Sequence, residues 1–301
     1  MKTLFLLILA LYAVAAQDYL VAAPFNPWKY HHKNLFKIDV STKRCSNLVD
    51  FNQVSGIQSA FIDRRDHTYI AMGMSLQYKA IAMTFNTSNG ARFEDKQFPY
   101  TPNDPRNGRY CDYYKYVIAV DTVAKTVWKF DLTSLTFEEV HQWKITIDDV
   151  EKPDPSITLL DVDSSAINSF TSMYYLIVKN VTTGVSYIAS LNYRELELTS
   201  MMPINVDFKG MFLQGSNLWA FSMKGQLGLI DATTGKFVPK YSVGRLPWME
   251  SVDYSPATDT VYYSFMEGSN YFVAGLNLAS GTEVFKMQLP ESMCYIRVDN
   301  Y

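Results

Sequence analysis

The stretch Gly228-Leu229-Ile230-Asp231-Ala232-Thr233-Thr234-Gly235 decides the fold class, because it is the clearest copy of a recurrent unit. It returns as Gly275-Leu276-Asn277-Leu278-Ala279-Ser280-Gly281. In each copy an apolar strand runs into a polar turn that Asp or Asn opens. Such a side chain caps the backbone of a tight turn, and glycine adopts positive φ there. The unit therefore predicts two antiparallel strands joined by a hairpin.

Four looser copies give the spacing of this unit, and they lie at residues 35–42, 84–90, 127–134 and 189–193. The six turn-opening residues are Asp39, Asn86, Asp131, Asn192, Asp231 and Asn277. Their spacings are 47, 45, 61, 39 and 46 residues. A period in the forties that is made of short strands is typical of a β-propeller blade. Six such units fill the 285 residues that remain when the first 16 are set aside.

The two ends of the chain predict how the ring closes. Only three strands precede the end of the first unit, so blade one lacks its innermost strand. The segment Met293–Asp299 remains after blade six and alternates like an inner strand. We therefore expect an all-β, six-bladed propeller of four-stranded antiparallel blades, in which the C-terminal strand completes blade one. Such closure removes two exposed sheet edges. Five or seven blades, an open sandwich, or two domains are the alternatives.

Composition agrees with a large β-rich core and excludes several classes of protein. Hydrophobic residues make up 48% of the chain, aromatic residues 15% and charged residues only 19%. This content excludes a disordered chain. The formal net charge of −3 argues against nucleic-acid binding through bulk positive charge.

The first 16 residues predict a secretory signal peptide. Lys2 precedes an apolar run, and the small residues Ala13-Val14-Ala15-Ala16 follow it. The run is shorter than the roughly 20 residues that a membrane span needs, and no later stretch qualifies. We therefore expect residues 17–301 to form one secreted, extracellular domain without a membrane span. A buried N-terminal helix is the alternative.

Secretion agrees with two glycosylation sequons, which begin at Asn86 and Asn180. The three cysteines are Cys45, Cys111 and Cys294. In an oxidising compartment an odd number allows one disulfide with one free thiol, or an intermolecular bridge. Their spacing leaves these alternatives open.

The loops that enter the inner strands, together with the turns between second and third strands, form one face of a propeller, here called the loop face. Ligands of propellers usually bind there, and aromatic and polar loop residues on a rigid scaffold suit recognition. The candidate ligand-binding residues on this face are Trp28, His31, His32, Tyr100, Arg106, Arg109 and Trp248. Alternatively, Trp28 and Trp248 only cover the ends of blades.

One segment carries a resemblance to known propellers. Trp248-Met249-Glu250-Ser251-Val252-Asp253-Tyr254-Ser255-Pro256, followed by Thr260-Val261-Tyr262-Tyr263, resembles a blade of the gluconolactonase/senescence-marker and strictosidine-synthase-like propellers. Phe208-Lys209-Gly210 with Asn217-Leu218-Trp219 is similar. The resemblance covers blades two, five and six at the level of the superfamily. It implies a divalent cation held by Asn, Asp and Glu at the channel mouth in the lactonases of that group.

This chain departs from the lactonase pattern at the matching positions, which are Gln58, Lys209, Glu250 and Cys294. Hard divalent cations require several oxygen ligands, and a lysine repels them. We therefore expect no metal or other cofactor there, and an ion pair between Lys209 and Glu250.

The leading interpretation is therefore a secreted binding propeller without catalysis. It would recognise an extracellular glycan, peptide or partner protein on its loop face. The competing interpretation is a lactonase-like or strictosidine-synthase-like hydrolase or lyase with a site at the channel mouth. A structural role in a matrix or coat is the third interpretation, which the odd cysteine leaves open.

Overall fold

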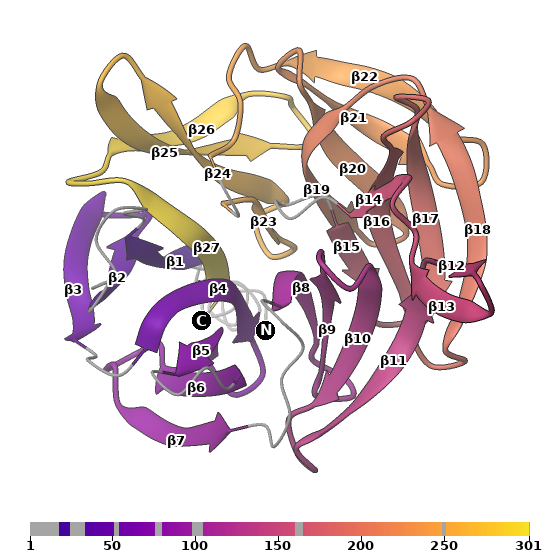
Figure 1. Cartoon of the computed structure of the whole chain (residues 1–301). Coiled ribbons are helices and arrows are strands. Elements are labelled where there is room, and N and C mark those ends of the chain that lie inside the picture. Colours follow the sequence, from indigo (N-terminus) through magenta and orange to yellow (C-terminus); the bar gives the residue numbers. More distant parts are fainter. Residues whose placement is uncertain are drawn as a thin grey trace, which may run out of the picture.

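The computed structural model describes residues 18–24, 34–50, 54–75, 80–97, 105–159, 165–248 and 251–300. Six antiparallel sheets stand around a central channel and form the six blades of a propeller (Figure 1). This confirms the all-β, six-bladed fold. Within the described ranges, no helix has the length and hydropathy that crossing a membrane requires.

Blade one contains the two ends of the described chain and has the order β27-β1-β2-β3. Its strands are β27 (Met293–Asn300), β1 (Asp18–Pro24), β2 (Asn34–Asp39) and β3 (Arg44–Asp50). In blade two the strands succeed one another from the channel outward in the order of the sequence. Its strands are β4 (Val54–Asp63), β5 (Thr68–Ser75), β6 (Ala80–Asn86) and β7 (Arg92–Gln97).

Blades three and four lie next in the ring. The strands of blade three are β8 (Pro105–Cys111), β9 (Tyr116–Asp121), β10 (Thr126–Asp131) and β11 (Thr136–Gln142). The strands of blade four are β14 (Ile157–Leu159), β15 (Ser165–Asn168), β16 (Met173–Asn180), β17 (Ser186–Asn192) and β18 (Glu197–Ile204). Its innermost layer is divided, because β14 and β15 pair with opposite halves of β16.

Blades five and six complete the ring. The strands of blade five are β19 (Phe208–Gln214), β20 (Asn217–Ser222), β21 (Gln226–Asp231) and β22 (Lys236–Ser242). The strands of blade six are β23 (Asp253–Ser255), β24 (Thr260–Glu267), β25 (Asn270–Asn277) and β26 (Glu283–Gln288).

The closing strand of blade one comes from the C-terminal end, as the sequence predicts. β27 lies antiparallel to β1, and Asn300 lies opposite Asp18. Side chains at both ends then reach the neighbouring blades. Asp299 accepts hydrogen bonds from Thr87 of blade two, and Asp18 accepts them from Ser255 and Tyr262 of blade six. The closing blade is therefore joined to both neighbours by buried polar contacts.

The turn-opening residues of the recurrent unit cap their turns as expected. The side-chain oxygens of Asp39, Asn86, Asp131, Asn192 and Asp231 each accept a backbone N–H two residues later, at 2.7–3.0 Å. Asn277 accepts the N–H of Ser280 at 3.0 Å. These bonds offer the turn backbone a local partner, which is why Asp and Asn mark this position.

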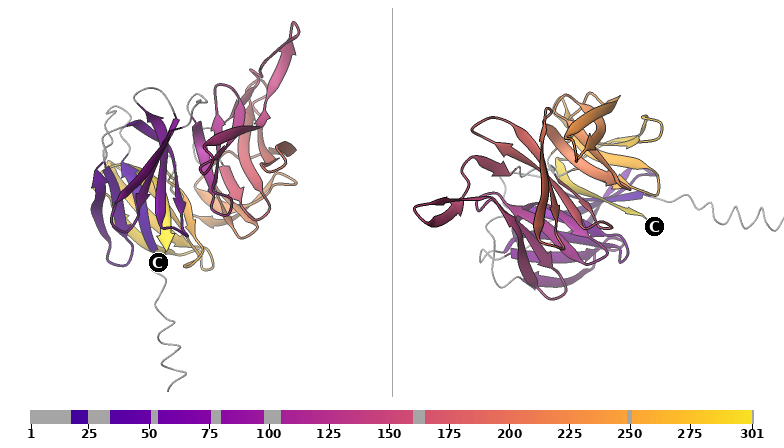
Figure 2. Two further views of the ribbon diagram at one scale, coloured as in Figure 1. Left: turned by 90° about the horizontal axis from the view of Figure 1, so that it is seen from below. Right: turned by 90° about the vertical axis from the view of Figure 1, so that its right-hand side faces the viewer.

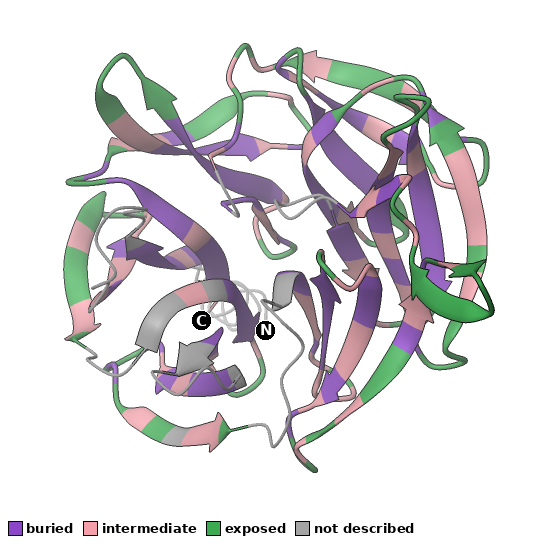
Figure 3. Ribbon diagram, in the orientation of Figure 1, coloured by how far each residue is buried: buried purple, intermediate pink, exposed green. Residues whose placement is uncertain are grey.

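Apolar side chains fill the space between blades. Six buried clusters lie in the described part of the chain, one for each pair of adjacent blades. The inner and middle strands are mainly buried, whereas the outer strands are mainly exposed or half-buried (Figure 3). Packing on both faces of each blade explains the high aromatic content and the low charge of the sequence.

An inserted hairpin accounts for the long spacing of 61 residues between Asp131 and Asn192. Strands β12 (Lys144–Ile147) and β13 (Val150–Pro153) pair only with each other among the described strands. The hairpin projects away from the ring (Figure 2). Its turn residues Asp148 and Asp149 both have positive φ, which suits a two-residue hairpin turn.

Candidate functional site

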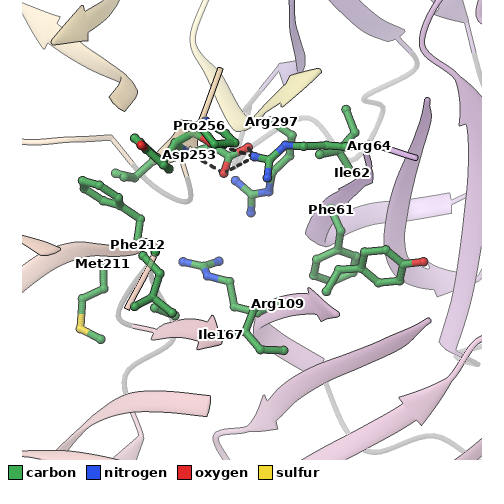
Figure 4. Close-up of a pocket in the computed structure, with 16 residues that line it drawn as sticks. Phe61, Ile62, Arg64, Arg109, Ile167, Met211, Phe212, Asp253, Pro256 and Arg297 are labelled. Carbon is green, nitrogen blue, oxygen red and sulfur yellow. Dashed lines mark hydrogen bonds and ion pairs between the residues drawn. The ribbon is translucent and has the colours of Figure 1, made fainter. Parts of the chain in front are cut away.

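A cavity of about 310 Å³ lies in the central channel, and all six blades contribute to its lining (Figure 4). Its lining includes Arg64, Gly215 and Pro256, which directly follow the inner strands β4, β19 and β23. The cavity therefore lies toward the face that carries the turns after the inner strands, here called the turn face. This is the opposite end of the channel from the loop face.

Arg64, in the β4–β5 turn, reaches across blade one to blade six. Its Nη2 atom lies 3.3 Å and 3.2 Å from the two carboxylate oxygens of Asp253. Its Nε donates to the carbonyl of Val298 at 3.1 Å, and its Nη2 to the carbonyl of Tyr254 at 2.9 Å. Asp253 also accepts the backbone N–H of Val298 at 2.8 Å. This ion pair fixes one side of the cavity.

Arg109 enters the cavity from β8, where the backbone is irregular. A bulge lies between Arg106 and Arg109, and Asn107 within it has a φ of +51°. Asn107 is buried, and its carbonyl accepts the hydroxyl protons of Ser165 and Tyr174. The bulge therefore turns Arg109 toward the channel with a rigid base.

Gly108 is required at this bulge by a close approach. A Cβ added there would lie 2.6 Å from the ring of Phe61. The guanidinium of Arg109 donates to the carbonyls of Ser165 at 3.0 Å and of Gly108 at 2.9 Å. These contacts hold the side chain between blades three and four.

Arg297 is the third arginine of the cavity, and it lies on the closing strand β27. It is only 5% exposed. Its Nε donates to the carbonyl of Ala60 at 2.5 Å, and its Nη1 to the carbonyl of Ile296 at 2.7 Å. Figure 4 shows the guanidinium groups of Arg64, Arg109 and Arg297 directed toward one space.

The rest of the wall is largely apolar and includes Phe61, Ile167, Met211 and Phe212. Among the described lining residues there is one carboxylate, Asp253, and no histidine or lysine. The two lining phenols stay protonated at neutral pH. Burial and the hydrogen bond to Asp63 raise the pKa of Tyr110, and burial with Asp259 raises the pKa of Tyr254 to about 12. In this state a phenol can donate a hydrogen bond to a ligand but does not act as a general base.

Two of the sequence-predicted ligand-face residues, Arg109 and Trp248, have side chains that the structure describes. Arg109 lines the cavity, although the prediction that Arg106 and Arg109 belong to a loop was wrong, since β8 begins at Pro105. Trp248 is half-buried, packs edge-on against Tyr271 and does not line the cavity. The remaining candidates lie outside the described residues: Trp28, His31, His32 and Tyr100, together with the side chain of Arg106.

The channel-mouth candidates whose side chains the structure describes, Lys209 and Cys294, lie near the opposite end of the inner strands. Lys209 is half-buried near the start of β19, and Cys294 is buried near the start of β27, where its thiol lies 3.7 Å from the carbonyl of Ala23. The side chain of Gln58 and all of Glu250 are outside the described part, so the expected Lys209–Glu250 pair stays a prediction. No group of three or more His, Cys, Asp or Glu within the described ranges has a metal-binding arrangement.

The cysteines and sequons also have defined positions. None of the three cysteines forms a disulfide; Cys45 is half-buried on β3, while Cys111 and Cys294 are buried. Asn86 ends β6 and Asn180 ends β16, so both sequons begin in turns.

Among the described lining residues, the charged ones that sequence reasoning did not select are Arg64, Asp253 and Arg297. Arg64 reads as part of the charged turn Arg64-Arg65-Asp66. Arg297 did carry a signal, because it is a single cation on an otherwise apolar strand that faces the channel.

No protein-family model and no curated protein matches the chain. Solved structures do match. A chain of a nidogen/laminin complex has a TM-score of 0.64 at 9% identity and covers 93% of this chain and 98% of its own. TolB from Acinetobacter baumannii has a TM-score of 0.62 at 11% identity, with 93% of this chain and 66% of TolB covered.

A protein from Lactobacillus plantarum has a TM-score of 0.56 at 8% identity and covers 94% of this chain and 99% of its own. At these identities the likeness shows the fold alone. The chain is a six-bladed β-propeller with no family assigned.

Proposed function

We propose that this chain is a secreted binding propeller without catalytic function, and that its ligand occupies the central cavity. The observation that carries the proposal is a cavity of about 310 Å³ that every blade lines, with apolar walls and a few convergent polar groups. Small-molecule sites are typically concave, preformed and of about 300–1,000 Å³. A rigid ring of six packed blades holds this shape.

The chemistry of the lining favours binding over catalysis. Its described carboxylate, Asp253, is occupied by Arg64 and by the N–H of Val298. A general base needs a group that accepts a proton near neutral pH and reaches the substrate. The described lining offers arginines and protonated phenols instead.

The alternative function is a lactonase-like or strictosidine-synthase-like hydrolase or lyase. It would require oxygen ligands at the channel mouth, where Lys209 stands at one of the matching positions. Incubation of the purified protein with γ- and δ-lactones, with added calcium or zinc, distinguishes the two functions. Metal-dependent lactone hydrolysis would support the enzyme and overturn the binding proposal.

Blocking the cavity tests the proposal directly. Ile167→Trp adds volume at the cavity wall, and Ile147→Trp makes the same change on the exposed tip of the β12–β13 hairpin. Each protein is incubated with an extract of small molecules, separated from it by gel filtration, and analysed for retained compounds by mass spectrometry. We expect a compound retained by the natural protein and by Ile147→Trp, and lost in Ile167→Trp. Equal retention by all three proteins would contradict the proposal.

Secretion is part of the same proposal and has its own test. Production in a eukaryotic secretory host should release a chain without residues 1–16 into the medium. Peptide mapping should find glycans at Asn86 and Asn180, whose turns are accessible at Ser88 and Thr182. A chain that stays in the cell with Met1 present would contradict secretion. Peptide mapping does not test whether loop-face residues such as Trp28 and Tyr100 recognise a ligand, so that role stays a prediction.

A further inference from the structure

We infer that the β12–β13 hairpin joins two copies of this chain, by antiparallel pairing of β12 with β12 of a second copy around a two-fold axis at Thr146. The hairpin follows β11 of blade three and projects away from the ring (Figure 2). Among the described strands, β12 and β13 pair only with each other. A two-stranded hairpin alone is marginally stable in water, and an open strand edge is a template for pairing with another chain.

The open edge of β12 presents backbone groups for this pairing. The two-residue turn Asp148-Asp149 joins the strands, and Ile147 lies opposite Val150. In such a hairpin the residues that flank the turn bond to each other, and every second residue along the strand turns its N–H and C=O outward. Thr146 and Lys144 therefore direct these groups to the open edge. Pairing around Thr146 satisfies them, since the N–H of each Thr146 then faces the carbonyl of the other.

The side chains along β12 have an order that complements itself. The segment Lys144-Ile145-Thr146-Ile147-Asp148 has a cation at one end, a carboxylate at the other and β-branched residues between them. With the axis at Thr146, Lys144 lies opposite Asp148 of the second copy, and Ile145 lies opposite Ile147, each twice. Opposite charges and β-branched cross-strand pairs both stabilise antiparallel sheets. An axis at Ile145 or Ile147 would lose both charge pairs, so this order selects one register.

The side chains that this pairing uses are accessible in the single chain. Lys144, Thr146 and Asp148 are exposed, and Ile147 is 42% exposed. Lys144 already bridges Glu151 of its own hairpin, with Nζ 2.6 Å from Oε2. An ammonium group has three donors, so it can hold Glu151 and the second copy's carboxylate together.

The resulting assembly is a dimer with the two rings far apart. Because the paired strands are antiparallel, the hairpins enter the shared four-stranded sheet from opposite ends. Ile145, Ile147 and Val150 of both copies then lie on one face of that sheet, and four strands with an apolar face are more stable than two. A two-fold interface uses the same patch on both copies and is complete with two chains. Since the patch is small, the dimer should depend on concentration.

Sedimentation equilibrium of the full chain from about 1 μM to about 1 mM, the range of affinities expected for a small interface, tests the inference. We expect the mass to rise from that of one chain to that of two. Thr146→Pro should abolish this rise, because proline removes the central N–H but is tolerated on an open edge. Thr146→Val is the matched control; it keeps the N–H and the β-branched shape, so it should dimerise like the natural protein.

Two charge variants test the register. Lys144→Glu places a carboxylate opposite Asp148 of the second copy, and Asp148→Lys places an ammonium group opposite Lys144, so each variant alone should stay monomeric. Lysine has positive φ at Lys115 and Lys125 of this chain, so the turn can accept it. An equimolar mixture of the two variants should dimerise, because every contact between unlike chains then joins opposite charges.

Three results would each overturn the inference. They are a natural protein that keeps the mass of one chain at every concentration, a Thr146→Pro variant that dimerises like Thr146→Val, and a mixture of the charge variants that associates no more than either variant alone. None of them bears on ligand binding in the central cavity, which the hairpin does not line.

Discussion

Arg64 and Asp253 form an ion pair, with Nη2 3.2 Å from Oδ2, that joins blade two to blade six over the strand that closes blade one. Val298 of that strand lies between them and contacts both, through its carbonyl to Arg64 and its N–H to Asp253. The same two side chains line the central cavity. Ring closure and the shape of the site therefore depend on one polar cluster.

Replacing Asp253 tests its part in closure. Asp253→Ala removes the acceptor of the Val298 N–H and the carboxylate that faces the guanidinium of Arg64, so the free energy of unfolding should fall by about 1–3 kcal/mol. Urea denaturation followed by circular dichroism measures the change. Glu195→Ala is the control, because it removes a carboxylate from an exposed turn and should change stability by less than about 0.5 kcal/mol. Equal stability of the two variants would show that the cluster is not a closing contact.

Removal of β27 tests whether the C-terminal strand closes the ring by completing blade one. Deletion of residues 293–301 takes away the innermost strand of blade one together with Asp299, which contacts His67 and Thr87. We expect a lower melting temperature and a broad, less cooperative transition in calorimetry. An unchanged melting temperature would contradict the closed ring.

A circular permutant provides the matched rescue. Asn300 and Asp18 lie opposite each other in an antiparallel pair, so a two-residue turn can join them. A chain that begins at Met293, continues through this turn from Asn300 into Asp18 and ends at Glu291 restores the order of blade one. It should recover most of the melting temperature that the deletion loses.

Acid should remove the stabilisation that Lys115 gives to Asp63. Burial opposes ionisation of Asp63, but the hydrogen bonds from Lys115 and Tyr110 outweigh it and hold the pKa of this carboxyl below its ordinary value. A carboxyl group whose pKa is lowered on folding stabilises the folded state at pH values above its unfolded pKa. This stabilisation is lost as the pH falls through the folded pKa.

Lys115→Met should therefore cost about 1 kcal/mol at pH 7, allowing for solvent screening of this half-exposed lysine, and close to nothing once Asp63 is protonated. Denaturation curves of both proteins from neutral to acid pH measure the difference. Lys224→Met, at an exposed turn position, should match the natural protein throughout. A difference that stays constant with pH would contradict the assignment.

The thiol of Cys45 should be alkylated slowly at neutral pH. Burial and the nearby charge of Glu291 raise the pKa of Cys45 to about 11. Because the thiolate is the reactive form, alkylation by iodoacetamide should still accelerate through pH 9, instead of levelling near the ordinary value of about 8.5. Peptide mass spectrometry should find Cys45 labelled and Cys111 and Cys294 protected in the folded chain. A rate that levels near pH 8.5 would contradict the raised pKa.

The sequence predicts the ring because each blade is marked locally. Asp231 and Asn277 open turns whose side chains cap the backbone three residues away or fewer, so the information lies within one short segment. The inserted hairpin also has a local signal that the repeat count concealed. Ile145 and Ile147 alternate with polar residues, and the Asp148-Asp149 pair provides the turn.

The cavity is less accessible to sequence reasoning, since its residues come from all six blades. Arg64 and Asp253 are separated by 189 positions in the chain but meet over one strand. Whether such side chains converge depends on the stagger of the inner strands and on bulges such as the one at Asn107. Alternation predicts that Arg297 faces the channel, but not which groups it meets there.

The central claim is that the ligand of this protein occupies the channel cavity that all six blades line. A crystal structure of the protein grown with a compound that it retains from the extract of small molecules tests this claim most directly. We expect the compound in the cavity, in contact with Phe61, Ile167 and Phe212. An empty cavity with the compound bound elsewhere on the molecule would contradict the account.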